Sequence, residues 1–262
     1  MEDKFIKFKY KDLNKVKNNL KESYDKDGFI HIDNVFPTTL CSEAQSVLLE
    51  YEKDLIENKN EVGLVTEKIG DSIRVKYYQG LYSVNQIFRK FYSIRLIEIA
   101  KILLGKDDLY FNDMETHIRN PGGTSIPKHQ DNFYFNLKNA KGLTCYIALN
   151  EHNTENGGLN YLSNSHRKRV VSHDASIEAG FSSSISDETE ALKKRLKSRI
   201  YKPHYFSGSV TMHHPENIHF ADKTRIESQR AFALSVRIFS SSEEIDPKGV
   251  ERYKKNLDKN RG

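Results

Sequence analysis

The chain has 262 residues, 29% of them charged, 37% hydrophobic and 11% aromatic, with a mean hydropathy of −0.68. This length suffices to bury a core without disulfide or metal staples, and the aromatic content argues against disorder. The net charge of +5 is mild and spread along the chain, which excludes an obvious nucleic-acid or membrane binder. Cys41 and Cys145 form no CxxC pair, so we expect no disulfide framework and a cytoplasmic setting. We see no signal peptide and no apolar run of the ~18 residues that a membrane span needs.

Helices are expected to dominate up to about residue 105. Residues 1–27 have helical spacing, and residues 28–33 alternate like a strand. A helix is predicted from Thr38 to about Asn58, with Pro37 at its start and apolar residues on one face. A second helix is predicted over 85–104 and ends at Gly105. Residues 62–84 between them are expected to carry short strands.

From Leu109 onward short β-like runs separated by Gly, Pro and Asn clusters take over. The predicted runs are 109–118, 133–137, 142–149, 159–162, 201–205, 209–213 and 230–239. Such spacing is typical of a sandwich or barrel. Residues 182–199 resemble a surface helix or an insertion, and residues 241–262 form a charged tail. We therefore expect one domain over 1–262, mainly β with supporting helices: helical support over about 1–105 and a β core over about 106–240.

The first candidate site is the sequence His129-Gln-Asp131. Alternate residues of a strand face the same side, with Cα atoms about 7 Å apart. An imidazole and a carboxylate would then project together and could bind one metal ion. A solvated loop pair is the alternative, since such a motif also arises by chance.

His219 could complete the set. It follows a predicted strand in a segment that begins at Gly208. Two histidines and one carboxylate leave metal positions open and are associated with non-haem Fe(II) oxygenases. The chain has ten histidines, so a hydrogen-bonded histidine without metal is the alternative. There is no thiolate cluster for a Cys-rich zinc site.

Arg230 is the third candidate. In the alternating run 230–239 it opens the more apolar face, together with Phe232 and Leu234. A guanidinium directed into a core is costly unless an anion meets it, and its planar fork matches a carboxylate. The anion would be a dicarboxylate ligand, unless Arg230 reaches water at the strand edge or pairs with Glu216 or Glu227.

Together these segments resemble the phytanoyl-CoA dioxygenase family of Fe(II)/2-oxoglutarate-dependent oxygenases. The resemblance covers about residues 20–240, and its matching pieces in order are Asp27-Gly-Phe-Ile, Pro127-Lys-His-Gln-Asp131, Leu143-Thr-Cys-Tyr-Ile-Ala-Leu149, Asn156-Gly-Gly-Leu-Asn-Tyr-Leu-Ser-Asn-Ser-His166, and Gly208-Ser-Val with His214, His219 and Arg230.

The resemblance implies a double-stranded β-helix (jelly-roll, cupin-like) core. It implies Fe(II) held by His129, Asp131 and His219, and 2-oxoglutarate held through its distal carboxylate by Arg230. O2 is the other co-substrate. The family often has Ser two positions and Asn five positions after the distal histidine, where this chain has Ala221 and Thr224, so the pose of 2-oxoglutarate can differ.

Further candidates surround this set. Thr144 is assigned to the cofactor site, while the candidate substrate contacts are His214, Phe133, Tyr146 and His166, each with core or surface packing as its alternative.

The leading hypothesis is a hydroxylase that acts on an unactivated C–H bond of a small polar metabolite, including anionic types such as a sugar acid, amino acid or phosphonate, with succinate and CO2 as co-products. The alternatives are a non-catalytic cupin-like binding protein, which Ala221 favours, and a zinc hydrolase. The substrate and the oligomeric state are not readable from the sequence, and no nucleic-acid or membrane partner is expected.

Overall fold

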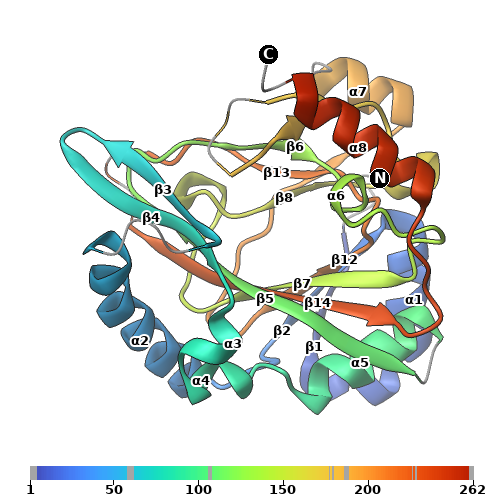
Figure 1. The fold of residues 1–262 in the computed structure, drawn as a ribbon. Coiled ribbons are helices and arrows are strands. Elements are labelled where there is room, and N and C mark those ends of the chain that lie inside the picture. Colours follow the sequence, from blue (N-terminus) through green and yellow to red (C-terminus); the bar gives the residue numbers. More distant parts are fainter. Residues whose placement is uncertain are drawn as a thin grey trace.

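The computed structural model describes residues 5–57, 62–105, 108–176, 178, 180–185, 189–225, 227 and 229–259. Two facing sheets form its centre, and helices cover the outside of the larger one (Figure 1). The large sheet has eight strands in the order β1-β2-β12-β7-β14-β5-β4-β3, and the small one has four in the order β11-β8-β13-β6. This interleaved pair of sheets is the double-stranded β-helix that the sequence predicts.

The strands of the large sheet are antiparallel except for the β1–β2 pair. They are β1 (Lys7–Lys9), β2 (Phe29–Asp33), β3 (Leu64–Ile69), β4 (Ser72–Gln79), β5 (Leu109–Arg119), β7 (Gly142–Ala148), β12 (Val210–His213) and β14 (Ala231–Ser240). The small sheet comprises β6 (Ile126–His129), β8 (Asn160–Leu162), β11 (Ile200–Tyr201) and β13 (His219–Ala221), and a separate pair comprises β9 (Asp174–Ala175) and β10 (Ser183–Ser184).

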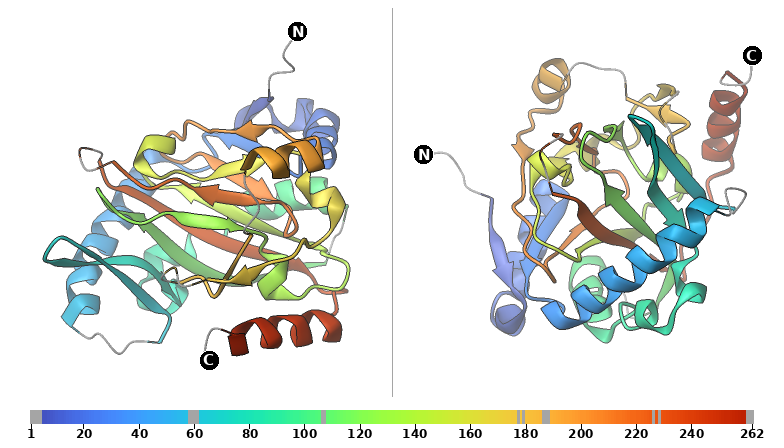
Figure 2. Two further views of the ribbon diagram at one scale, coloured as in Figure 1. Left: turned by 90° about the horizontal axis from the view of Figure 1, so that it is seen from above. Right: turned by 90° about the vertical axis from the view of Figure 1, so that its left-hand side faces the viewer.

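The helices are α1 (Lys17–Asp27), α2 (Thr38–Glu57), α3 (Leu81–Val84), α4 (Gln86–Arg89), α5 (Ile94–Leu104), α6 (Asn132–Phe135), α7 (Thr189–Leu196) and α8 (Pro247–Lys259). Figure 2 shows α2 lying along the outer side of the large sheet and α8 at one end of the molecule. None of the helices in the described part of the chain is long and apolar enough to cross a membrane.

The main core lies between the large sheet and the helices. The buried residues of α2 recur every three or four positions, which places Cys41, Ala44, Leu48 and Leu55 on one face. On β14 the residues Phe232, Leu234, Val236 and Ile238 face the same core. The other face of β14, which carries Ala233, faces the space between the two sheets.

Several predicted elements differ from the structure. Residues 7–9, within the range of helical spacing over 1–27, form strand β1, and the strand expected over 201–205 is only β11 at 200–201. The helix expected over 85–104 is two helices, because residues 90–93 leave the helical path and Ser93 caps α5 by accepting a hydrogen bond from the Arg95 amide. The strand expected over 133–137 is instead the short helix α6. The charged tail contains the thirteen-residue helix α8, whose apolar face packs near α6 and β9.

Part of the N-terminal expectation and part of the predicted surface helix over 182–199 fall on residues 1–4 and 186–188, which lie outside the described residues. Within the rest of that second range, β10 and α7 are formed. Cys41 and Cys145 are buried free cysteines.

Candidate active site

The small sheet brings His129, Asp131 and His219 together. His129 ends β6 and His219 begins β13, and the two residues pair directly across the antiparallel ladder, with their ring centroids 4.2 Å apart. Asp131 lies two residues past the end of β6, at the start of α6. The carboxylate therefore reaches the imidazoles from a turn and not from the strand that the sequence predicts.

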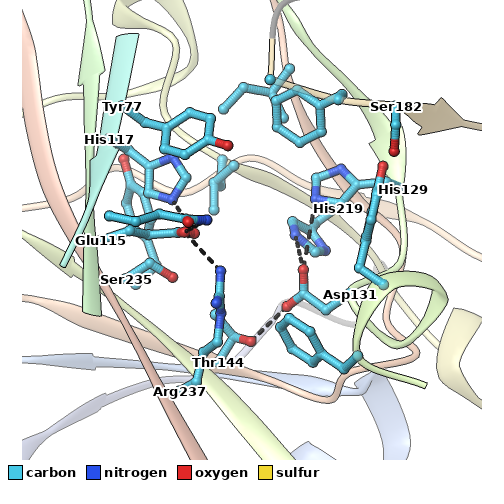
Figure 3. A pocket seen from close by; sticks show the side chains of 18 of the residues that line it. Tyr77, Glu115, His117, His129, Asp131, Thr144, Ser182, His219, Ser235 and Arg237 are labelled. Atoms are coloured by element: carbon cyan, nitrogen blue, oxygen red, sulfur yellow. Dashed lines mark hydrogen bonds and ion pairs between the residues drawn. The ribbon is translucent and has the colours of Figure 1, made fainter. Parts of the chain in front are cut away.

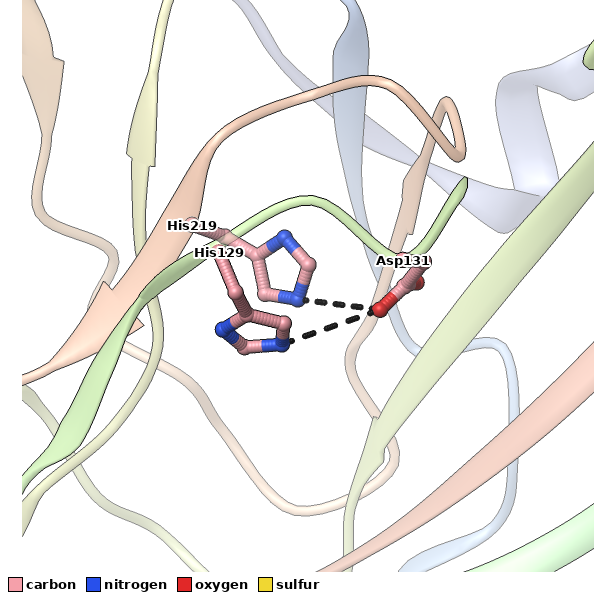
Figure 4. A group of neighbouring side chains, drawn as sticks. All are labelled: His129, Asp131 and His219. Atoms are coloured by element: carbon pink, nitrogen blue, oxygen red, sulfur yellow. Dashed lines mark ion pairs between the residues drawn. The ribbon is translucent and has the colours of Figure 1, made fainter. Parts of the chain in front are cut away.

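The three side chains present one ligand atom each to a common point (Figure 4). Their ligand atoms all lie within 4.8 Å of one another. Asp131 Oδ1 is 3.7 Å from His129 Nε2 and 3.5 Å from His219 Nε2. All three residues are buried, so this is an interior site and not a solvated acidic cluster.

Backbone carbonyls fix the tautomers of both histidines. His129 Nδ1 lies 2.8 Å from the Pro127 carbonyl oxygen, and His219 Nδ1 lies 3.0 Å from that of Asn217. A carbonyl only accepts, so each Nδ1 carries the hydrogen and each Nε2 keeps its lone pair. Metal-bound histidines are commonly oriented in this way.

Asp131 is held through its other oxygen. The Thr144 hydroxyl donates to Asp131 Oδ2 at 2.6 Å, and His213 Nε2 lies 3.1 Å from the same atom. Oδ1 is thereby left toward the two imidazoles. The donor set, two neutral nitrogens and one carboxylate oxygen, fits a ferrous ion with open positions.

The protonation states suit metal binding. Burial lowers the pKa of His219 well below its ordinary value, and the neighbouring His129 and His213 lower it further. Burial would raise the pKa of Asp131, but the three surrounding imidazoles, His219 above all, hold it far below its ordinary value. Metal binding requires neutral imidazoles and an ionised carboxylate, and the direction of each shift favours the form that its residue would need.

The three residues open onto a cavity of about 740 Å³ between the two sheets. Figure 3 shows His129, Asp131 and His219 on one wall, with Tyr77, Glu115, His117, Ser235 and Arg237 across from them. A pocket of this size is in the range of small-molecule binding sites.

A charged group forms the opposite wall. Arg237 donates to Glu115 at 2.7 Å and to Asp113 at 3.0 Å, and His117 Nε2 lies 3.2 Å from the second oxygen of Glu115. Burial would raise the pKa of Glu115, but Arg237 and then His117 lower it to about 2. Arg237 is the one lysine or arginine among the described residues that line the cavity.

Arg230 does not lie in this cavity, and the predicted location is wrong. Its guanidinium donates to both oxygens of Glu52 on α2, at 2.7 and 2.9 Å. The side chain lies on the face of β14 that packs on the helices, where Glu52 is buried. The anion that neutralises Arg230 is thus a protein carboxylate, and neither Glu216 nor Glu227 is that partner.

The other predicted residues divide into two groups. Thr144 and Tyr146 line the cavity, as expected from their shared face of β7. Phe133 does not: it is buried and stacks on His173 with the ring centroids 4.1 Å apart. His166 and His214 also lie outside the lining, with their rings 5.3 Å apart.

Sequence reasoning missed His213, Glu115, His117 and Arg237. Two of them had a visible signal. Glu115 and His117 alternate with Thr116 in a predicted strand, so they share a face, and polar residues repeated on one face of a barrel strand can point inward. His213 and Arg237 are located only by register, because both pair with Thr144 from opposite sides.

A comparison with known families places the chain. The phytanoyl-CoA dioxygenase (PhyH) family model matches residues 24–231. The chain belongs to the phytanoyl-CoA dioxygenase family.

An individual relative matches this chain at low sequence identity. A probable alpha-ketoglutarate-dependent hypophosphite dioxygenase from Stutzerimonas stutzeri is 27% identical over 145 residues, 54% of this chain. The match spans 49% of that relative, about half its length.

Solved structures share the fold of the family member at low identity. The epimerase SnoN from nogalamycin biosynthesis, solved with Fe3+ and alpha-ketoglutarate, is 18% identical with a TM-score of 0.68, over 92% of this chain and 90% of SnoN. EctD from S. alaskensis, solved with bound Fe, is 18% identical with a TM-score of 0.68, over 87% of this chain and 78% of EctD.

Proposed function

We propose that this protein is an Fe(II)- and 2-oxoglutarate-dependent dioxygenase that hydroxylates a C–H bond of a small organic molecule. The observation that carries the proposal is the buried donor set of His129, Asp131 and His219, whose ligand atoms lie within 4.8 Å of one another at a cavity of about 740 Å³. Membership of the phytanoyl-CoA dioxygenase family supports the same reading.

When bound, the ferrous ion and 2-oxoglutarate supply the oxidation with O2, and succinate and CO2 leave as co-products. His129, Asp131 and His219 hold the metal. Thr144 and His213 hold the carboxylate of Asp131 in its orientation through Oδ2. The side chains of the cavity position the substrate and exclude water.

Arg237 is our candidate for the distal carboxylate of 2-oxoglutarate. Its side chain projects from the inner face of β14, level with Thr144 and thus with the metal ligands. Two of its donors already face Glu115 and Asp113, and a guanidinium has five. A planar fork can serve a further carboxylate.

Arg119, a buried arginine on the strand beside β14, is a weaker candidate for the distal carboxylate of 2-oxoglutarate. Arg119 pairs with Ala231, and its guanidinium donates to the carbonyl oxygens of Gly157, Thr124 and Asp222. Those bonds tie loops together, and Arg119 does not line the cavity.

An anaerobic titration tests the proposal. Addition of Fe(II) and then 2-oxoglutarate to the protein should produce a visible charge-transfer band, and His129→Ala should abolish it. His204→Ala is the matched control, because His204 is an exposed histidine paired with Glu151.

The outcomes separate the candidate functions. Succinate formation under O2 supports the enzyme, whereas a band without succinate indicates a binding protein. Zinc in the purified protein with no band indicates a hydrolase and contradicts the proposal.

A further inference from the structure

The C-terminal helix α8 forms part of the cavity wall, although it lies beyond the family match that ends at residue 231. Tyr253 and Leu257 of α8 line the cavity. The helix is fixed in place by Asn256, which is buried and donates to the His173 carbonyl at 3.2 Å and to the Ser183 hydroxyl at 2.9 Å. The wall is therefore an ordered feature of this chain.

Aromatic rings connect this helix to the metal site. Tyr253 meets Tyr134 edge-on at 5.7 Å between centroids, and Tyr134 lies 6.1 Å from the ring of His129. Phe181 lies 4.9 Å from the same His129 ring. Tyr134, Phe181 and Tyr253 are half-buried, so part of each is open to the cavity.

The hydroxyls of the two tyrosines are already used by the protein. Tyr134 donates its hydroxyl hydrogen to the Ser183 carbonyl at 2.5 Å, and the Tyr253 hydroxyl lies 3.3 Å from that of Ser182. Both hydroxyls are thus engaged with the protein, and the rings supply apolar surface to a ligand. Together with Leu257 they form an apolar wall near the metal ligands.

With Fe(II) and 2-oxoglutarate bound, the charges that remain in the cavity disfavour a second anion. The two positive charges of Fe(II) would be matched by the two negative charges of 2-oxoglutarate. Glu115, Asp131 and Glu178 line the cavity, while Arg237 is its one lysine or arginine among the described lining residues. Arg237 already faces Glu115 and Asp113 and would also meet the distal carboxylate of 2-oxoglutarate. An anionic substrate would therefore lose its hydration in a cavity that offers it no cation of its own, which is costly.

Hypophosphite, named for the Stutzerimonas relative, is a small anion. It offers no ring or hydrocarbon body to the apolar wall of the cavity.

We propose that Tyr134, Phe181, Tyr253 and Leu257 form an apolar subsite that holds the ring or hydrocarbon body of an uncharged or cationic substrate. This inference rests on the proposed function and narrows its substrate class: it favours uncharged or cationic substrates over the anionic types considered from sequence. Ring contacts of this kind are also selective for cations over anions, because aromatic faces attract positive charge.

Calorimetric binding of matched probes tests the subsite. The protein is loaded with Fe(II) and 2-oxoglutarate without O2, and 4-phenylbutanol, 4-phenylbutylamine, 4-phenylbutyrate and hypophosphite are titrated in turn. We expect the alcohol and the amine to bind at least tenfold more tightly than the carboxylate, and hypophosphite to bind no more tightly than the carboxylate. Repeating the series without metal separates failure of the subsite from failure of the proposed function.

Variants on α8 locate the binding. Tyr253→Ala should weaken 4-phenylbutanol binding roughly three- to tenfold, the usual worth of an aromatic contact, and Leu257→Ala should also weaken it. Tyr253→Phe keeps the ring and should bind like the wild type, as should Lys254→Ala on the exposed side of the helix. Equal or tighter binding of 4-phenylbutyrate or hypophosphite, or unchanged affinity in both Tyr253→Ala and Leu257→Ala, overturns the inference.

Discussion

Exchange of one arginine for lysine distinguishes the two candidate anchors of 2-oxoglutarate. In Arg237→Lys the positive charge stays beside Glu115 and Asp113, so neither carboxylate loses its counter-charge. What is lost is the planar fork that a carboxylate can engage through two parallel hydrogen bonds. A lysine is thus a milder change than glutamine, which would leave two acids uncompensated.

The expected magnitude follows from the bonds lost. A hydrogen bond to a charged group contributes roughly 1.5–3 kcal/mol, and each 1.4 kcal/mol is about tenfold in affinity. Loss of one such bond in Arg237→Lys should weaken 2-oxoglutarate binding by about 10- to 100-fold, with Fe(II) affinity little changed. The assay is the anaerobic titration of the Fe(II)-loaded protein with 2-oxoglutarate.

Arg230→Lys is the matched control. Its guanidinium pairs with Glu52 on the helix side of β14, remote from the cavity lining. We expect its 2-oxoglutarate affinity to match the wild type and its unfolding midpoint to fall modestly. The reverse pattern, weakened binding in Arg230→Lys and none in Arg237→Lys, refutes the assignment of Arg237.

Three further predictions concern the supports of the site and fold. Thr144→Val removes the hydroxyl that orients Asp131 and should lower Fe(II) affinity about 10- to 100-fold, measured by competition with a chelator; Thr144→Ser should retain most of it, and equal affinities in all three proteins would contradict this role. Burial would raise the pKa of Asp33, yet its hydrogen bonds lower it from 3.8 to about 2. The ionised Asp33 therefore contributes about 2 kcal/mol to the free energy of unfolding above pH 4, and this contribution is lost as the pH falls toward 2. In urea unfolding, Asp33→Asn should be less stable than the wild type at pH 7, and the difference should shrink by pH 3. A difference that stays constant with pH would rule this out. Gly208→Ala should destabilise the fold by about 2 kcal/mol, because φ is +82° and a Cβ would lie 2.1 Å from the Phe36 carbonyl oxygen; thermal unfolding checks this, and an unchanged midpoint would contradict it.

The candidate metal ligands could be predicted from the sequence because their signal is local. His129 and Asp131 are two residues apart, and together with His219 and the other matching segments they resemble one family. The alternation of 230–239 was also correctly anticipated: Phe232 and Leu234 face the main core. Local motifs and the alternation of apolar residues were thus sufficient to predict which residues lie in the protein core.

The position of Arg230 could not be predicted from the sequence, for a reason that lies in β geometry. Successive strand residues point to opposite faces, so alternation identifies the two faces but not which of them lines a ligand cavity. The apolar face of β14 turned out to pack on α2, where the buried carboxylate of Glu52 meets Arg230. Glu52 lies far away in sequence, and no local pattern announces that pairing.

Helix α8 shows the same limit. Its many charged residues led to the prediction of a charged tail without a helix. A helix that packs through a narrow apolar stripe has few apolar residues, so its sequence gives a weak helical pattern. Tyr253 and Leu257 are four positions apart and so lie on one side of the helix. That stripe is visible in hindsight, but the surface it covers is set only by the tertiary fold.

Register finally links the metal to the proposed cosubstrate anchor. His213 on β12 and Arg237 on β14 both pair with Thr144 on the central strand β7. Two of these three side chains hold Asp131, and the third is our candidate for the distal carboxylate of 2-oxoglutarate. A slip of one residue between β7 and β14 would turn Arg237 toward the helices while leaving Asp131 held. The pairing of β7 with β12 and β14 therefore fixes both the support of Asp131 and the position of Arg237. The distance between the candidate metal ligand and the candidate cosubstrate anchor is thus set by the sheet and not by a loop.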